Sequence, residues 1–260
     1  EAAPDRRQQV SLGCAKKVWQ IQARALAHAG RWCTAMTQAQ QELRWLPCLV
    51  QSMRGVREEG ADISTLAFAS LMTQLVCVFD YLGAVMHFAK HDMLTKTQSL
   101  HMVSVNQPQL RDIVATDKAA GRVTVKDSCA RNLHRLVCCL KFLRVLLENL
   151  ARSPQVSIKE AATAAYQESL APIHSYMVRT AVWAGMYVLP TREQFMSQIG
   201  ETDESARVLG LQFLADAKVV EKHVEKLFDE ISMPASVPSS TILAGLWGGG
   251  PAAATSPAKH

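Results

Sequence analysis

Aromatic residues and strand-like segments are scarce in this chain of 260 residues. Phe, Trp and Tyr make up only 6% of the chain, although 48% of its residues are hydrophobic. No run of alternating apolar and polar residues, rich in Val, Ile and aromatic side chains, is present. A β sandwich or barrel requires such runs. The composition therefore excludes an all-β fold and favours an all-α protein with a sizeable core.

Long apolar runs and regular cysteine spacings are also missing. Ahead of the C-terminal tail, the longest charge-free segment is residues 63–79, which Ser, Thr and Gln interrupt and Asp80 ends. This segment is short and polar for a membrane span. Seven cysteines without a CxxC spacing predict reduced thiols rather than a disulfide framework. We expect a soluble cytoplasmic protein that is peripheral to membranes.

Motifs of the common enzyme classes are absent as well. The sequence contains no GxSxG, HExxH, Walker A or GxGxxG motif. His87 and His91 are spaced as metal ligands can be, but no third ligand has a matching spacing. The formal charge of +5 without dense Lys/Arg clusters argues against nucleic acid and fits anionic membranes or phosphate ligands. We expect a monomer that is not an enzyme and has no cofactor, metal or nucleic-acid partner.

The two ends of the chain differ in composition from the middle. Residues 1–42 carry six basic residues against Glu1 and Asp5 before Glu42, and form a basic extension that is disordered, transit-like or from outside the native frame. Residues 234–260 are rich in Pro, Ser, Gly and Ala and lack charge until Lys259, which predicts a disordered tail. One domain is therefore expected over residues 43–233.

Hydrophobic periodicity and capping residues predict helices throughout this domain. The expected helices cover residues 43–57, 64–82, 84–103, 109–120, 128–153, 157–170, 172–188, 191–199 and 203–231. The most strongly patterned is SCARNLHRLVCCLKFLRVLLENLARS, at 128–153. One apolar stripe along it predicts contact with the core, and a polar stripe predicts contact with solvent. The apolar stripe is Leu133, Leu136, Val137, Leu140, Leu143, Leu147 and Leu150, and the polar stripe is His134, Lys141, Glu148 and Arg152.

A second line along this helix places two cations above an apolar column. Arg131 and Arg135 lie one turn apart, and Cys138, Cys139, Phe142 and Leu146 continue the line. If Asp127 or Ser128 is the N-cap, Arg131 lies in the first turn, where the helix dipole disfavours a cation by roughly 0.3–1 kcal/mol. Two interpretations are open. The arginines pair with carboxylates of a neighbouring helix, or they hold an anion such as the phosphate of a lipid.

Two further features gain meaning only in combination with these arginines. Asp92 and Lys96 are spaced i, i+4 and by themselves predict a surface ion pair, although apolar neighbours at 85, 88 and 89 place Asp92 near the rim of a core. His174, close after Pro172, would by itself be a structural histidine. The ordered set Asp92xxxLys96, Arg131xxxArg135, His174 and LPTR at 189–192 resembles the glycolipid transfer protein family. The resemblance covers roughly residues 66–233 and is greatest to the ceramide-1-phosphate branch, within it to the plant accelerated-cell-death type.

The resemblance implies a fold and a role for each of these residues. The implied fold is a two-layer helical sandwich of about eight helices that encloses a single lipid pocket. In the family, the carboxylate at Asp92 accepts from the amide and hydroxyl of the sphingoid base, and the histidine at 174 donates to the acyl carbonyl. Lys96 and Arg135 replace the Asn and Trp of sugar-binding members, and with Arg131 they would bind a phosphate. We expect Val85, Phe88, Cys139, Phe142 and Leu146 to line the chain pocket and Tyr176 to dock on membranes. Trp183 and Tyr187 are expected in the core, with a contribution to docking as the alternative.

The function that the resemblance implies is non-enzymatic transfer of a sphingolipid between membranes. The expected ligand is ceramide-1-phosphate or its phytoceramide counterpart, and contact with membrane surfaces would be transient. One alternative is a lipid sensor that uses the same pocket to signal to a protein partner. Another is a helical scaffold without a ligand, which requires the column below Arg135 to be filled by the protein's own side chains.

Overall fold

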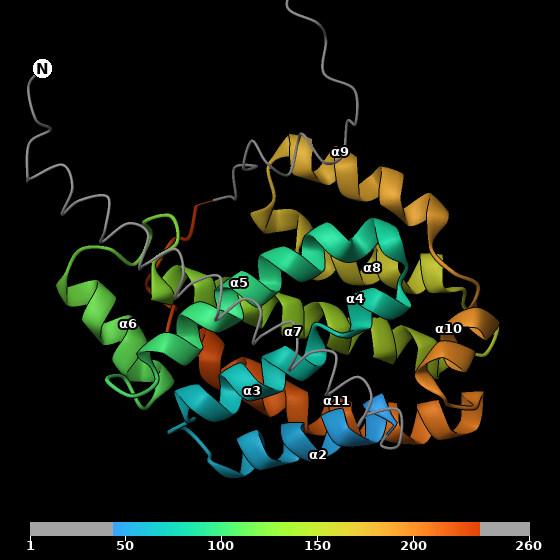
Figure 1. Ribbon diagram of the computed structural model, residues 1–260, viewed down its shortest axis with the longest axis horizontal. Helices are drawn as coiled ribbons and strands as arrows, with labels where there is room; N and C mark the ends of the chain where they lie inside the picture. The colour runs from blue at the N-terminus through green and yellow to red at the C-terminus, as the bar shows by residue number, and fades with distance from the viewer. Residues whose placement is uncertain (1–43, 235–260) are drawn as a thin grey trace, which may run out of the picture. The chain divides into compact units, whose positions relative to one another are not determined.

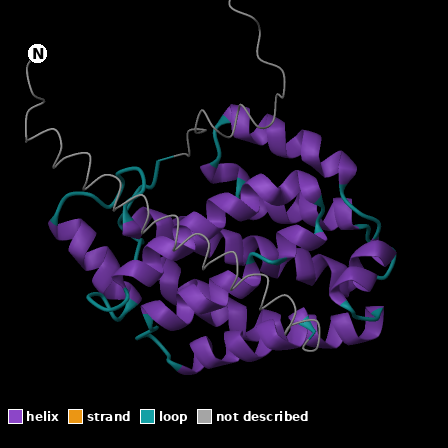
Figure 2. Cartoon of the chain, in the orientation of Figure 1, coloured by secondary structure: helices purple, strands orange, loops and turns teal. Residues whose placement is uncertain are grey.

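The computed structural model describes residues 44–234, apart from the side chain of Val85. These residues are helical, and no strand occurs among them, only an isolated bridge between Ser64 and Gln109 (Figure 2). The all-α prediction is confirmed. The α-helices are α2 (Trp45–Glu58), α3 (Thr65–Leu75), α4 (Val78–Tyr81), α5 (His87–Val103), α6 (Leu110–Ala119), α7 (Cys129–Arg152), α8 (Ile158–Ser169), α9 (Tyr176–Gly185), α10 (Arg192–Ile199) and α11 (Asp203–Lys226), and the 3-10 helices are η1 (Ala84–Met86), η2 (Ala171–Ile173) and η3 (Met186–Val188).

The helices of residues 46–234 form the two layers that the resemblance implies (Figure 1). In one layer, α5 packs against α3 and α4. In the other, α7 packs between α8 and α11, and α5 lies across α7. Because α7 contacts helices of both layers, it is the element that positions most of the others.

The expected N-cap and apolar stripe of α7 are confirmed. The Ser128 side chain accepts from the backbone N–H of Arg131 at 3.2 Å, and every residue of the apolar stripe is buried. The prediction of a solvent-facing stripe is wrong, because α8 and α11 cover that side of the helix. Of its four residues only Arg152 is exposed; His134, Lys141 and Glu148 are half-buried.

Three expected helices differ from the structure at their boundaries. The helix expected over 64–82 is divided into α3 and α4 around Val76 and Cys77. The helix expected over 172–188 is interrupted at His174 and Ser175, whose backbones are extended. The last helix ends at Lys226 rather than Ile231. In each case apolar periodicity continues through the break, so the pattern alone could not place it.

Several other expectations have an outcome in the described residues. Trp183 and Tyr187 are 39% and 74% exposed, so their prediction as core residues is wrong. The cysteines of the described residues are in the thiol form, with Cys139 buried and Cys77 and Cys138 half-buried. Among residues 44–234, no helix is both long and apolar enough to cross a bilayer. The extension 1–42 and the tail beyond Pro234 lie outside the described residues, so the domain boundaries stay a prediction.

Candidate functional site

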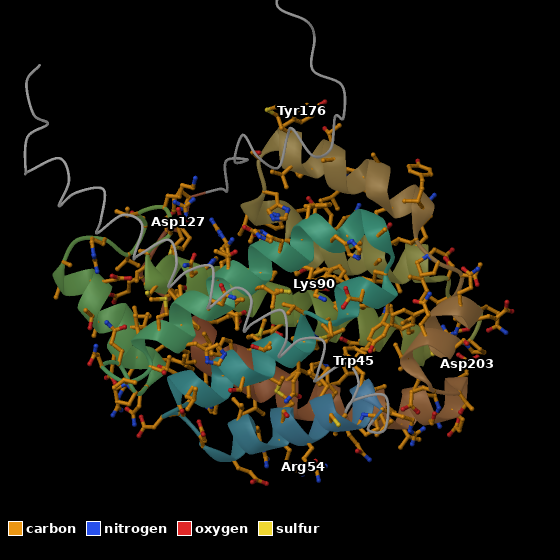
Figure 3. The ribbon with its side chains drawn as sticks, viewed as in Figure 1. Trp45, Arg54, Lys90, Asp127, Tyr176 and Asp203 are labelled. Atoms are coloured by element: carbon orange, nitrogen blue, oxygen red, sulfur yellow. The ribbon has the colours of Figure 1, made fainter. Side chains whose placement is uncertain are left out.

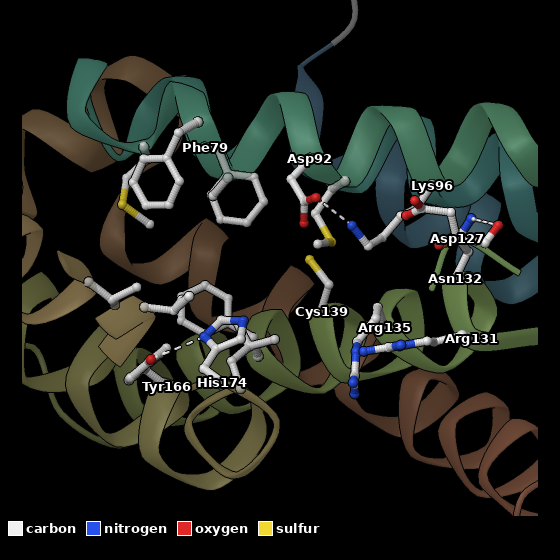
Figure 4. Close-up of a pocket in the computed structure, with 18 of the residues that line it drawn as sticks. Phe79, Asp92, Lys96, Asp127, Arg131, Asn132, Arg135, Cys139, Tyr166 and His174 are labelled. Atoms are coloured by element: carbon white, nitrogen blue, oxygen red, sulfur yellow. Dashed lines mark hydrogen bonds and ion pairs between the residues drawn. The ribbon is translucent and has the colours of Figure 1, made fainter. Parts of the chain in front are cut away.

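A pocket of about 360 Å³ lies between the two layers, with α5 on one side and α7, α8 and α9 on the other (Figure 4). This volume is in the range of ligand sites in proteins. All five residues expected to bind a lipid head group line it: Asp92, Lys96, Arg131, Arg135 and His174. The structure thus brings together residues that are up to 82 positions apart in the chain. Their role toward a lipid stays a prediction.

The residues contributed by α5 form an ion pair inside this pocket. Lys96 donates through Nζ to Oδ1 of Asp92, one helical turn before it (Figure 4). The Lys96 side chain is 15% exposed and that of Asp92 is 38% exposed. The pair therefore lies at the rim of the pocket rather than in open solvent. Asp92 Oδ2 is not involved in this ion pair and is available as an acceptor.

Arg135 is the most deeply buried cation of the pocket. The residue is 3% exposed, and among residues 44–234 no carboxylate forms an ion pair with it. Its Nη1 lies 3.2 Å from Nδ1 of His134, its Nη2 donates to the carbonyl of Pro234, and its Nε is buried without a partner. Burial lowers the pKa of the Arg135 guanidinium. Pairing with a neighbouring carboxylate, one of the two interpretations of the sequence, does not occur for this arginine.

Arg131 lies at the outer end of the same line. Its Nη1 donates to the carbonyl of Thr124 at 3.0 Å, in the loop that connects α6 to α7. This hydrogen bond and the cap of Ser128 hold the first turn of α7 against the loop. The two guanidinium groups therefore face one pocket from successive turns of a rigid helix.

His174 is a neutral donor in the pocket. Burial and the neighbouring Arg135 lower the pKa of the imidazole to about 4. The Tyr166 hydroxyl lies 3.1 Å from Nδ1 of His174, and burial raises the pKa of Tyr166 to about 12, so this hydroxyl keeps its proton. We assign the hydroxyl as donor to Nδ1, which leaves the Nε2–H group of His174 to donate to a ligand.

The apolar part of the pocket agrees with only some of the expected residues. Phe88, Cys139 and Phe142 line it, and the ring of Phe142 stacks on Phe79 with 6.4 Å between centroids. Leu146, one turn beyond Phe142, is fully buried and is not among the residues that line this pocket, so its contact with a lipid chain stays a prediction. Val85 lies in η1, and its side chain is outside the described structure.

Three polar residues at the pocket mouth were not expected from the sequence: Lys126, Asp127 and Asn132. The first two belong to the loop before α7, where Asp127 has a left-handed backbone with φ 63°. Asn132 donates through Nδ2 to the Ser99 hydroxyl at 2.9 Å and so connects α7 with α5. The sequence signal that could have identified them is their position near the N-terminus of α7, next to Arg131 and Arg135. Loop residues have no periodicity, so their direction could not be predicted.

Tyr176, the expected membrane-docking residue, begins α9 and is 77% exposed (Figure 3). Other exposed apolar side chains lie on α9 and η3, namely Met177, Trp183, Tyr187 and Val188. Nζ of Lys159 lies 3.7 Å from the centre of the Tyr187 ring. The structure therefore has an apolar surface on the helix that follows His174.

Comparison with known proteins identifies the family. The family model described as glycolipid transfer protein (GLTP) matches residues 63–201. The "ACD11 homolog protein" of Arabidopsis thaliana is 32% identical over 182 residues, 70% of this chain and 80% of that protein. The human "Ceramide-1-phosphate transfer protein" is 26% identical over 202 residues, 72% of this chain and 94% of that protein.

Solved structures agree with this assignment. The apo form of Arabidopsis ACD11 (accelerated-cell-death 11) has a TM-score of 0.67 and 25% identity, covering 71% of this chain and 97% of that chain. Human ceramide-1-phosphate transfer protein in complex with 12:0 ceramide-1-phosphate has a TM-score of 0.65 and 23% identity, covering 73% and 98%. The two-layer helical fold and the matched residues lead to one conclusion: this chain belongs to the glycolipid transfer protein family.

Proposed function

We propose that this protein binds ceramide-1-phosphate, or its phytoceramide counterpart, and carries it between membranes. The observation that supports this proposal is the convergence of Lys96, Arg131 and Arg135 at the mouth of one partly apolar pocket. A phosphate monoester has three acceptor oxygens and nearly two negative charges, which match guanidinium and ammonium donors. Lys126, at the same mouth, adds a fourth cation.

Recognition of the ceramide amide would come from Asp92 and His174. An ionised carboxylate only accepts hydrogen bonds, so Asp92 would pair with the amide N–H and hydroxyl of a sphingoid base. The neutral imidazole of His174 would donate from Nε2 to the acyl carbonyl. A diacylglycerol lipid presents only ester oxygens to Asp92, so phosphatidic acid should bind poorly although it has the same phosphate.

Relatives with the same fold support the choice of ligand. The human and Xenopus tropicalis relatives are both named ceramide-1-phosphate transfer protein. The cavity argues against a ligand-free scaffold, because such a scaffold would fill the column below Arg135 with its own side chains. A lipid sensor would use the same pocket, and it differs from a carrier in binding lipid without accelerating its exchange.

Transfer also requires contact with the donor membrane. Tyr176 and the exposed apolar residues of α9 would enter the membrane interface, where tyrosine and tryptophan are favoured. We propose that a single chain docks with this surface and that the pocket opens toward it. No chemical step is part of this activity.

Substitution of the arginines tests the proposal. We expect Arg131→Ala or Arg135→Ala to lower ceramide-1-phosphate transfer between vesicles by at least about tenfold, because each loses a charge-assisted contact to phosphate. Arg207→Ala, which breaks the exposed 2.9 Å pair with Glu204, is the matched control. Wild-type transfer by both pocket variants would contradict the head-group assignment.

Native mass spectrometry gives an independent test. We expect the protein purified from cells to carry one lipid with the mass of a ceramide phosphate, released on denaturation. Stoichiometric binding of this lipid without accelerated exchange between vesicles would favour the sensor over the carrier.

A further inference from the structure

The C-terminal turn, defined as residues 227–234, is hydrogen-bonded to Arg135 of the pocket. Arg135 Nη2 donates to the Pro234 carbonyl, 99 residues away in sequence. A guanidinium offers two forks for a two-point contact with phosphate, Nε with Nη2 and Nη1 with Nη2. Both forks use Nη2, each through one of its two N–H groups. The Pro234 carbonyl takes one of these N–H groups and lies against the nitrogen that a bidentate phosphate needs.

The other donors of Arg135 are placed so that a phosphate could accept from them. Nε, the second member of one fork, is buried and has no partner. Nη1 lies 3.2 Å from Nδ1 of His134, whose pKa is lowered to about 4 by burial and by the two pocket arginines. Every hydrogen-bond partner that the described residues give to this buried cation is thus neutral. A phosphate oxygen carries much more negative charge than a carbonyl oxygen and attracts the guanidinium more strongly, so a phosphate would displace the carbonyl here.

The C-terminal turn is held firmly at its start and weakly at its end. The Phe228 ring is 7% exposed and packs edge-on against His134, with 5.2 Å between ring centroids. The backbone N–H of Ile231 donates to the carbonyl of Phe228 at 2.8 Å. From Ser232 to Pro234, the bond to Arg135 is the one hydrogen bond that the described structure contains, and Ser232 and Pro234 are exposed. The end of the turn can therefore move away while Phe228 stays in place.

We propose that the C-terminal turn is an internal competitor for the lipid phosphate. This inference rests on the proposed function. In the empty protein the Pro234 carbonyl holds the Arg135 guanidinium; when ceramide-1-phosphate enters, its phosphate takes the Nε and Nη2 donors and Pro234 leaves. Lipid loading is then coupled to the position of residues 232–234. We call the form in which Pro234 contacts Arg135 the closed form. The apparent affinity for ceramide-1-phosphate falls as the fraction of protein in the closed form rises.

A double-mutant cycle in the full chain tests the competition. The Ser232→Gly/Met233→Gly/Pro234→Gly variant adds chain freedom that the closed form must lose, and so disfavours the contact. If about four-fifths of the wild-type protein is in the closed form, only about one-fifth is free to bind. We therefore expect the variant to bind ceramide-1-phosphate about fivefold more tightly than wild type. Affinity for ceramide, which has no phosphate, should be unchanged. In an Arg135→Ala background the three glycines should have no effect, because no contact remains to be released.

Nuclear magnetic resonance of the Met233 methyl group gives a direct readout, with Met233→Leu to assign the signal. We expect this signal to narrow and move toward its random-coil position when ceramide-1-phosphate is added, and not when ceramide is added. The competition proposal would be overturned, and the proposed function would not, by either of two results. One is unchanged or weaker ceramide-1-phosphate binding by the glycine variant. The other is a Met233 methyl signal that does not change when ceramide-1-phosphate is added. Failure of the wild-type chain to bind ceramide-1-phosphate at all would overturn the proposed function as well.

Discussion

Individual side chains in the pocket have environments that match distinct parts of a phosphosphingolipid. Arg135 is a buried cation that has no carboxylate ion-pair partner among residues 44–234, and Asp92 keeps one carboxylate oxygen outside its ion pair. His174 is neutral and oriented by Tyr166. These differences in charge and hydrogen-bond capacity, rather than the pocket volume, determine the ligand class that we propose.

The head-group preference should change with two side chains. The family resemblance implies that sugar-binding members have Asn and Trp where this chain has Lys96 and Arg135. An aromatic face and amide hydrogen bonds suit a sugar. We expect Lys96→Asn/Arg135→Trp to lose ceramide-1-phosphate transfer and to gain binding of glycosylceramide, measured in the same vesicle assay. If no glycolipid binding is gained, other mouth residues such as Lys126 and Asp127 shape the site.

Two half-buried histidines should make stability depend on pH. The pKa values of His134 and His174 are lowered from 6.5 to about 4, mainly by burial. Between pH 4 and pH 6.5, these histidines bind more protons in the unfolded chain than in the folded one. Stability should therefore be complete above pH 6.5 and fall as the pH drops toward 4, by up to roughly 3 kcal/mol for each histidine.

Denaturant unfolding at pH 7, 6, 5 and 4.5 measures this loss. The His134→Gln/His174→Gln variant should show a shallower decline, with a residual slope because burial also lowers the pKa of His101. Parallel declines for variant and wild type would show that these two histidines do not cause the pH dependence.

At the scale of elements, the LPTR motif has a structural role. The Arg192 guanidinium donates to the carbonyls of Leu150, Ser153 and Val156 and pairs with Asp203 at 2.7 Å. Carbonyls at the end of a helix have no partner inside the helix, so Arg192 caps the end of α7. Sequence resemblance identified this residue as a family feature, but its contacts place it away from the pocket.

The contact between α7 and α11 contains a buried ion pair that should be essential for stability. Arg144 Nε donates to Glu221 Oε2 at 2.6 Å, and the two side chains are 9% and 8% exposed. We expect Arg144→Leu to destabilise the protein by up to about 3–5 kcal/mol, because the buried Glu221 carboxylate loses its closest partner and keeps only Lys141, at 3.9 Å. Urea denaturation measures the loss.

A second substitution separates charge from packing at this contact. Arg144→Leu/Glu221→Leu should recover much of the loss, since both buried charges are removed. Arg207→Leu, at an exposed pair with Glu204, should change the free energy of unfolding by less than about 1 kcal/mol. A double variant as unstable as Arg144→Leu alone would mean that side-chain shape, not charge, stabilises the contact.

At the scale of the whole molecule, the charge of +5 should attract the protein to anionic membranes. We expect association with phosphatidylserine vesicles to weaken severalfold as salt rises from about 0.05 to 0.5 M, because exposed charges are screened. Binding of short-chain ceramide-1-phosphate in solution should weaken less, since Arg135 is buried. Co-sedimentation and calorimetry measure the two; equal salt dependence would contradict separate docking and binding contacts.

The sequence determined the helices and the chemical identity of the candidate site. Helix periodicity and the capping residues Ser64, Ser128 and Thr191 depend on neighbours a few positions apart, and the structure contains the corresponding helices and caps. The tertiary structure alone decided that α7 is covered on nearly all sides, that Leu146 is not among the residues that line this pocket, and that Pro234 meets Arg135. Such contacts join residues far apart in the chain, and local patterns of hydrophobicity carry no information about which distant surface will cover a helix.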